Sequence, residues 1–188
     1  NRVTLIAETI NNSPTSTITA NELAISNAAN AGTNTDRLLT DINDLLVSNS
    51  GSVYIRDNNL INITQFDNTL LLDVSNLAGD ITDGVALISS GELKLTANNG
   101  NIVLDDNNQL SGSLSLVASG NVVLNNSINT DLALVTAQNL TVTSTGQLTD
   151  SGIITATGDT TLTSASDIVL DSANNLNRSE GRRVGKES

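Results

Sequence analysis

Short aliphatic segments with alternating apolar and polar positions recur along the chain, separated by segments rich in Asn, Asp, Ser and Gly. Alternation with a period of two is typical of β-strands that bury one face. From Gly51 onward the pattern is regular, because two sets of turn residues recur 19 to 21 positions apart. These residues are Gly91, Gly112, Asp131 and Gly152 in the first set, and Gly100, Gly120, Asn139 and Gly158 in the second.

An aliphatic segment follows each turn residue within two or three positions, so one repeat of about twenty residues holds two strands. The clearest copy is Gly100–Asp105 (GNIVLD), which returns at Gly120–Asn125 as GNVVLN. This spacing predicts an all-β solenoid, a parallel β-helix in which each strand pairs with its counterpart one coil away, about 4.8 Å along the axis. About nine such coils form a rod roughly 40 Å long.

The interior of such a coil is narrow, and it accepts Val, Ile, Leu or Ala at every second position. Asn side chains are suited to the corners, where stacked amides form hydrogen-bonded ladders. The predicted corners are Asn98–Asn99, Asp105–Asn108, Asn125–Asn126 and Asn174–Asn175. The structural alternative is an antiparallel sandwich, since Asn99-Gly100 is a strong two-residue hairpin signal. We favour the solenoid because hairpins do not require a constant coil period.

Residues 1–50 are less regular. Val3–Ala7 and Leu23–Ser26 are predicted strands, and Pro14 lies in a polar turn between them. Asp36–Val47 fits either a short amphipathic helix or two strands joined by a bend, and we favour the two strands because both flanks resemble strands. The next strand-sized apolar segments are Val53–Ile55, Leu70–Leu72 and Val85–Ile88.

The last eleven residues, 178–188, break this composition abruptly. They have no aliphatic alternation and contain four of the eight basic residues of the chain. The segment resembles the translation of a sequencing adapter, with a basic linker as the alternative. We therefore expect a non-native tail without ordered structure, and divide the chain into a solenoid shaft (residues 1–177) and this tail. On that interpretation the chain is a fragment of a longer protein.

Net charge narrows the possible partners. The formal charge is −12 for the whole chain and −14 for residues 1–177, which hold only four basic residues. Such a chain neutralises few phosphates, so we expect no nucleic-acid partner and no attachment to anionic membranes. No segment approaches the roughly 18 apolar residues that a membrane span needs. Cysteine is absent, which excludes disulfides and thiolate sites.

The sequence offers few candidate catalytic groups. Histidine is absent, so histidine acid–base catalysis is excluded. Asp105-Asp106 and the pair Asp80 and Asp83 fall at predicted corners, where solvated turns are a better interpretation than a glycosidase pair. Oxygen ligands for calcium are plentiful, but no calcium-loop motif occurs, and we assign no ligands. We therefore predict no catalytic, cofactor-binding or metal-binding residue and no cofactor.

Three surface features have weak functional interpretations. Tyr54 and Arg56 are expected on one strand face, where a contact between coils is favoured over a sugar subsite. A threonine row could stack on two neighbouring coils, as in ice-binding solenoids, although ordinary strand propensity explains it equally. The row comprises Thr141, Thr143, Thr145, Thr161 and Thr163. Asn-x-Ser/Thr triplets at Asn11, Asn62 and Asn139 are expected by chance in this composition.

Several repeats, GNIVLDDNN, GNVVLNN, GSVYIRDNNLINI and GDTTLTSASDIVLDSANNLN, resemble those of filamentous-haemagglutinin-type exoproteins. The segment DRLLTDINDLLVSNSGSVYIRDNN also resembles a recurring unit of those surface proteins. The resemblance covers most of residues 3–177. It implies a right-handed β-helix shaft, exported by two-partner or related type V secretion through an outer-membrane transporter. It also implies display as an adhesin whose host-cell, glycan or matrix ligand is unknown. The secretion module of that family is not visible in this sequence.

The sequence thus predicts a non-enzymatic shaft segment of a large bacterial adhesin, secreted or displayed on the cell surface. A polysaccharide-active β-helix lyase or hydrolase is the first alternative. An ice-binding or calcium-binding solenoid is the second. Scattered basic residues and only two aromatic residues argue against the enzyme, which needs groups that bind sugar carboxylates and rings.

Overall fold

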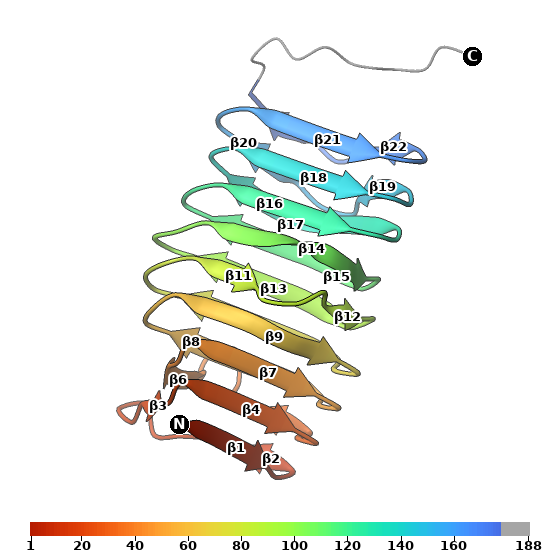
Figure 1. The fold of residues 1–188 in the computed structure, drawn as a ribbon. Helices are drawn as coiled ribbons and strands as arrows, with labels where there is room; N and C mark the ends of the chain where they lie inside the picture. Colours follow the sequence, from red (N-terminus) through yellow and green to blue (C-terminus); the bar gives the residue numbers. More distant parts are fainter. Residues whose placement is uncertain (178–188) are drawn as a thin grey trace, which may run out of the picture.

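The computed structural model describes residues 1–177, and this part of the chain is an all-β solenoid (Figure 1). One long sheet, here called sheet A, has the strand order β1 (Arg2–Ile6), β4 (Glu22–Ser26), β7 (Asp44–Ser48), β9 (Ile61–Asp67), β11 (Ile81–Asp83), β14 (Ile102–Leu110), β16 (Val122–Asn126), β18 (Leu140–Ser144) and β21 (Thr160–Ser164), with β12 (Ile88–Ser89) beside β14.

The second sheet, sheet B, returns the chain on the opposite side of each coil. Its strands are β2 (Thr9–Ile10), β3 (Ile18–Thr19), β5 (Asn30–Ala31), β6 (Leu38–Asp41), β8 (Ser52–Asp57), β10 (Leu71–Asn76), β13 (Glu92–Ala97), β15 (Ser113–Ala118), β17 (Thr130–Ala137), β19 (Leu148–Asp150), β20 (Ile154–Ala156), β22 (Ile168–Val169) and β23 (Asn175–Leu176).

Strands of successive coils pair in parallel throughout the described residues, which confirms the predicted β-helix with about twenty residues per coil. In sheet A, for example, Ile61 is in register with Ile81, Ile102 and Val122. In Figure 1 the nearer strands run to the right and the farther strands return to the left as the chain rises, so the coil is right-handed. The antiparallel sandwich is wrong: Asn99-Gly100 joins β13 to β14 across a corner instead of closing a hairpin.

Alternate residues of both sheets fill one continuous aliphatic core. Val53, Leu72, Leu93, Leu114 and Leu132 form a column of register partners along sheet B, and each is fully buried. Each such column receives one side chain from every coil, so branched aliphatic residues fill it without gaps. This agrees with the predicted composition of the interior.

The turn glycines mark places where two coils approach too closely for a side chain. A Cβ atom added at Gly112 would lie 2.0 Å from the carbonyl oxygen of Gly91, one coil earlier. The same is true at Gly91, where the added atom would lie 1.8 Å from the Thr69 carbonyl oxygen. The regular spacing of these glycines therefore follows from steric contact between the backbones of neighbouring coils.

Asparagine and aspartate side chains form a hydrogen-bonded ladder at the corner that precedes sheet A. Asn101 donates its backbone and side-chain N–H groups to Asp80 Oδ1, at 2.7 and 3.0 Å. Asn121 donates its backbone N–H to Asn101 Oδ1 at 2.8 Å, and Asn139 donates its side-chain amide to Asn121 Oδ1 at 2.8 Å. Asp159 continues the series by donating its backbone N–H to Asn139. An amide ladder of the predicted kind is present, but at Asn101, Asn121 and Asn139, which are not among the predicted corners. It satisfies the backbone where the chain turns.

Residues 36–47 form two strands, β6 and β7, joined at Ile42 and Asn43, so the favoured interpretation is confirmed and the helix is wrong. Pro14 lies in a turn, as predicted. The predicted strand at Val85–Ile88 is largely wrong. Only Ile88 belongs to a strand, and Val85 is 46% exposed in a loop, because sheet A is interrupted after Asp83.

The predicted corners need correction. Asn98–Asn99 connects two sheets as expected, whereas Asn125–Asn126 forms the end of β16 and Asn175 begins β23. Asp105–Asn108 lies inside the long strand β14, where the register shifts between Leu104 and Asn108. The extra residues are accommodated as a bulge, which bends the strand and turns Asn108 inward. The predicted tail, residues 178–188, lies outside the described residues.

Candidate functional site

The N-terminal coils contain two insertions that leave the regular solenoid on the same side, residues 11–17 and 32–37. Figure 1 shows β3 and its adjoining loop projecting from the side of these coils. Asn12 donates its side-chain amide to the carbonyl oxygens of Ser16 and Leu39, at 2.7 and 3.3 Å, which fastens the first insertion to β6.

Arg37 fastens the second insertion. Its guanidinium forms two hydrogen bonds of 2.8 Å with the carboxylate of Asp73, two coils further along the axis. It also lies over the ring of Tyr54, with Cζ 5.8 Å from the ring centroid. The side chains of Arg37 and Asp73 are only 18% and 11% exposed, so solvent screens this pair weakly. Sequence reasoning missed the contact because the two residues are 36 positions apart.

A polar groove lies between these insertions and the outer face of sheet B. It has a volume of about 420 Å³, within the range of small-ligand sites. Arg56, Leu39 and Ser75 from the strands line it, together with Pro14, Asn34, Thr35, Asp36, Arg37, Leu77 and Asn98. Tyr54 and Arg56 point outward on one face, as predicted, because the alternate residues Val53, Ile55 and Asp57 are buried.

Arg56 differs from the other basic residues in residues 1–177. Arg2 pairs with Glu22 at 2.8 Å, Lys94 pairs with Glu92 at 2.9 Å, and Arg37 pairs with Asp73. The Arg56 side chain is exposed and has no ion-pair or hydrogen-bond partner within the described part of the chain. The groove therefore contains an available guanidinium in a strongly acidic protein.

Asp83 corrects the expectation of a solvated turn, because it is only 8% exposed. Its carboxylate accepts backbone N–H groups from Asp105 and Asp106 and the side-chain amide of Asn108, at 3.1, 3.3 and 2.7 Å. Burial raises the pKa of Asp83, and the nearby charge of Asp106 adds to the rise, while the three hydrogen bonds oppose it. The carboxylate thus stabilises the bulge of the next coil.

Asp150 forms the same arrangement on the opposite side of the coil. It accepts backbone N–H groups from Asp171 and Ser172 and the side-chain amide of Asn174. Burial raises its pKa, but the hydrogen bonds outweigh burial and leave the pKa below the ordinary value. Asp83 ends a strand of sheet A, whereas Asp150 ends a strand of sheet B. The motif therefore recurs on opposite corners of the rod.

The threonine row forms a small array on sheet A. Thr141 is in register with Thr161, and Thr143 with Thr163, while Val123 and Asn125 occupy the same columns one coil earlier. The predicted stacking of the two threonine pairs is therefore present, and it extends over two coils. Among the triplet asparagines, Asn11 is exposed, and Asn139 is part of the corner ladder.

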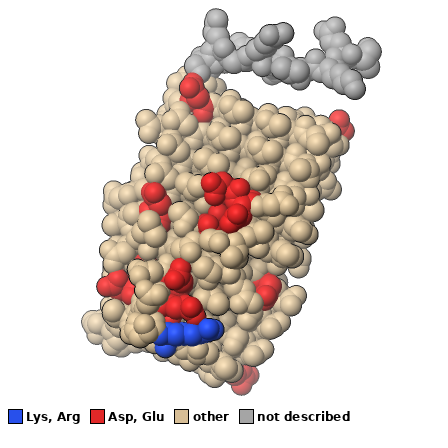
Figure 2. Space-filling view, in the orientation of Figure 1, with Lys and Arg blue, Asp and Glu red and all other residues tan. Residues whose placement is uncertain are grey.

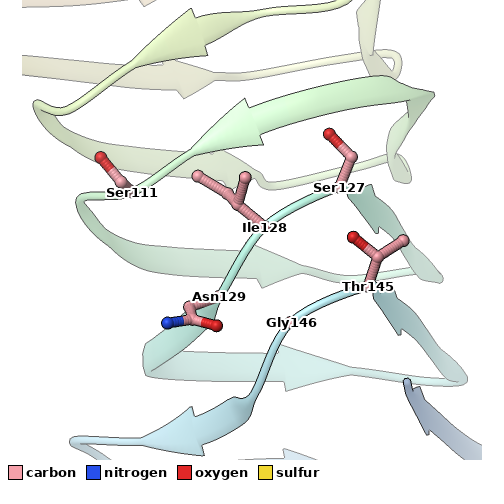
Figure 3. Close-up of a pocket in the computed structure, with 6 residues that line it drawn as sticks. All are labelled: Ser111, Ser127, Ile128, Asn129, Thr145 and Gly146. Carbon is pink, nitrogen blue, oxygen red and sulfur yellow. The ribbon is translucent and has the colours of Figure 1, made fainter. Parts of the chain in front are cut away.

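The remaining surface offers little concentrated chemistry. Figure 2 shows acidic side chains dispersed over the sheet A face, with one cluster near its middle and basic side chains only near the N-terminal end. An open concavity spans three successive corners near Ser127, Ile128 and Thr145 (Figure 3), and neutral residues line it. Within residues 1–177, no group of three or more acidic residues is placed to hold a metal ion, and no helix could cross a membrane.

Fold and surface together define this protein as a parallel β-solenoid built from stacked repeats. The chain belongs to the family DUF5649, described as repeats of unknown function, whose model matches residues 50–117 and 119–179. Each matched segment contains one of the two aspartate motifs, Asp83 in the first and Asp150 in the second. Neither a curated protein nor a solved structure matches the chain.

Proposed function

We propose that this chain is a segment of the shaft of a large bacterial adhesin, secreted or displayed on the cell surface. Its role is mechanical: each coil adds about 4.8 Å of rod, and the shaft holds a ligand-binding region away from the cell. The observation that carries this proposal is the parallel ladder of nine successive strands in sheet A. Such a ladder extends in one dimension, since each coil contacts mainly its neighbours.

Surface charge supports the same role. A formal charge of −14 over residues 1–177 disfavours side-by-side association of exposed strands. The resemblance to filamentous-haemagglutinin-type repeats adds an outer-membrane transporter as the export partner. The proposal therefore combines an extended shape with the export route that the resemblance implies.

The experiment is to raise an antibody against residues 1–177 and to label intact and permeabilised cells of the source bacterium. We expect labelling of intact cells, together with an uninterrupted reading frame that encodes further coils of about twenty residues. Antigen detected only after permeabilisation would overturn surface display. The enzymatic alternative has its own assay: the purified chain is expected to leave pectin-like polymers intact, and release of reducing ends would favour a lyase or hydrolase.

A further inference from the structure

The groove at Arg56 combines three features that the regular coils do not share. It holds the only basic side chain of residues 1–177 that lacks an ion-pair partner. Five of its ten lining residues come from the two insertions, residues 11–17 and 32–37, which stand beside the outer face of sheet B. Hydrogen bonds of Asn12 and the Arg37–Asp73 ion pair hold both insertions in place. The groove is therefore a preformed feature, for which rod geometry alone provides no reason.

The groove lining suits a small polar ligand that carries one negative charge. Arg56 supplies a planar guanidinium that can bind a carboxylate through two parallel hydrogen bonds. Asn34, Ser75 and Asn98 supply amide and hydroxyl groups that can form hydrogen bonds with sugar hydroxyls in a groove of this size. Leu39 and Leu77 offer half-buried apolar surface for the C–H face of a sugar ring.

We propose that this groove binds a sugar residue bearing a carboxylate, with Arg56 as the partner of the carboxylate. The surrounding charge selects the class of ligand. Asp36 lines the same groove, and the chain as a whole is strongly acidic, so a densely charged polyanion is repelled. A uronate has a single carboxylate and several hydroxyls, which match one cation and several neutral polar groups.

The test is a nuclear magnetic resonance titration of the whole chain, labelled with nitrogen-15, with D-glucuronate and with D-glucose. These two probes differ only at C6, which bears a carboxylate in glucuronate and a hydroxymethyl group in glucose. We expect glucuronate at millimolar concentrations to shift the amide signals of residues 34–37, Arg56 and Ser75, and glucose to shift them far less. Equal responses to the two sugars, or no response to either, would overturn the proposal. Sodium sulfate is the third probe, and shifts equal to those with glucuronate would show anion binding without sugar recognition and also overturn it.

Two variants complete the test. Arg56→Gln removes the cation, and it should weaken glucuronate binding about tenfold or more, since hydrogen bonds to charged groups are among the stronger ones. The Arg56 side chain is exposed and makes no hydrogen bond, so this variant is expected to fold, which circular dichroism checks. Lys94→Gln is the matched control, because it makes the same charge change outside the groove lining. Equal loss of binding in both variants would contradict a specific role for Arg56.

This inference deepens the adhesin proposal by naming a ligand class, but its experiment is independent of surface display. Glucuronate binding by the purified chain, with labelling confined to permeabilised cells, would support the groove and remove the adhesin. Labelling of intact cells without glucuronate binding would support the adhesin proposal and contradict ligand binding in the groove. The two proposals can therefore fail separately.

Discussion

The first coils and the later coils build the same sheet A around cores that are offset along the strand. At the third inward position, the early coils place Leu5, Ile25, Val47 and Phe66 in register. In the later coils the third inward position is polar, with Asn108, Asn126, Ser144 and Ser164 in register with one another. At the start of the strands the order is reversed: exposed Asn21 and Asn43 precede β4 and β7, whereas fully buried Ile61, Ile81 and Ile102 begin β9, β11 and β14.

Strand β9 is where the two arrangements meet. It is seven residues long and buries Ile61, Ile63 and Phe66, so it fills all three inward positions. The register with β7 shifts between Leu45 and Leu46, which leaves one extra residue in β9. The family match begins at residue 50, close to this change. The comparison shows that the apolar core can shift by two residues along the strand while the strands of successive coils remain paired.

The later arrangement buries a set of polar side chains, and hydrogen bonds satisfy their polar groups. Asn126 is fully buried; its Oδ1 accepts the Leu110 N–H at 2.8 Å. Its amide donates to the Leu110 carbonyl oxygen and to Thr130 Oγ1, both at 3.0 Å. Thr130 in turn donates to Ser144 Oγ at 3.0 Å. A buried network with complete pairing favours one register over its neighbours, because a slip would leave these groups without partners.

Replacing an apolar side chain by a polar one at the third inward position, or the reverse, should have the largest effect on the free energy of unfolding. Ile25→Asn removes a buried aliphatic side chain and places an amide where the early column is entirely apolar, so we expect a loss of about 3–5 kcal/mol in the free energy of unfolding. Asn126→Leu should cost about 2–4 kcal/mol, because it removes partners from buried backbone groups at Leu110. Chemical denaturation followed by far-ultraviolet circular dichroism measures both.

Ile25→Val is the matched control for Ile25→Asn, because it keeps the position apolar and removes a single methyl group. Ile25→Val should cost only about 1 kcal/mol. If the polar and apolar exchanges changed stability by less than this control, the two halves of the column would be interchangeable, and the comparison would fail.

The two aspartate motifs provide a second, smaller contrast. Asp83→Ala removes an acceptor in the middle of the rod, between coils on both sides, and we expect local exchange protection to fall at Asp105, Asp106 and Asn108. Asp150→Ala should affect only the last described coil, at Asp171 and Ser172, and reduce global stability less. Hydrogen exchange monitored by mass spectrometry locates both effects. Equal global losses would contradict the difference between the two positions.

Acidification should have the smallest effect, and its sign follows from the same groups. Burial raises the pKa of Asp57 and Asp83 above the ordinary value of 3.8, so in this window the folded state binds protons that the unfolded state does not. The free energy of unfolding therefore rises as the pH falls from neutral through these raised pKa values. Below 3.8 the lowered pKa of Asp150 acts in the opposite sense, and its contribution is lost.

Thermal midpoints measured between neutral pH and pH values below 3.8 are therefore expected to pass through a maximum on the acid side. Asp83→Asn should flatten the rise. A midpoint that falls steadily from neutral pH downward would show that these two carboxyl groups do not control the acid response.

Much of the fold was predictable because the repeat makes each residue informative about its counterparts. Gly91 and Gly112 recur where coils touch, and Ile102 and Val122 recur where they pack, so period and alternation identify the solenoid. The interruption after Asp83 was not predictable, since the following apolar segment resembles an ordinary strand. Only the contacts of Asp83 with the next coil show why the sheet is interrupted there.

Less of the groove could be predicted from the sequence. Tyr54 and Arg56 were placed on one face correctly from strand alternation. The insertions that wall the groove were not predicted, because they lack a periodic signal, and the Arg37–Asp73 pair joins residues far apart in the sequence. The available signal in the sequence was the small number of basic residues in an acidic repeat protein. The structure shows which of the four basic residues in the described part of the chain has no ion-pair partner.

The stacking of coils in parallel register can be tested directly by cross-linking, since the chain has no native cysteine. Thr141 and Thr161 are register partners on the outer face of sheet A, where adjacent strands lie about 4.8 Å apart, close enough for a disulfide. We predict that the double variant Thr141→Cys with Thr161→Cys oxidises to an intramolecular disulfide, identified by mass spectrometry. Thr141→Cys with Thr163→Cys, which is two residues out of register, should do so far less. Preferential cross-linking of the second pair, or of neither, would contradict the coil stack.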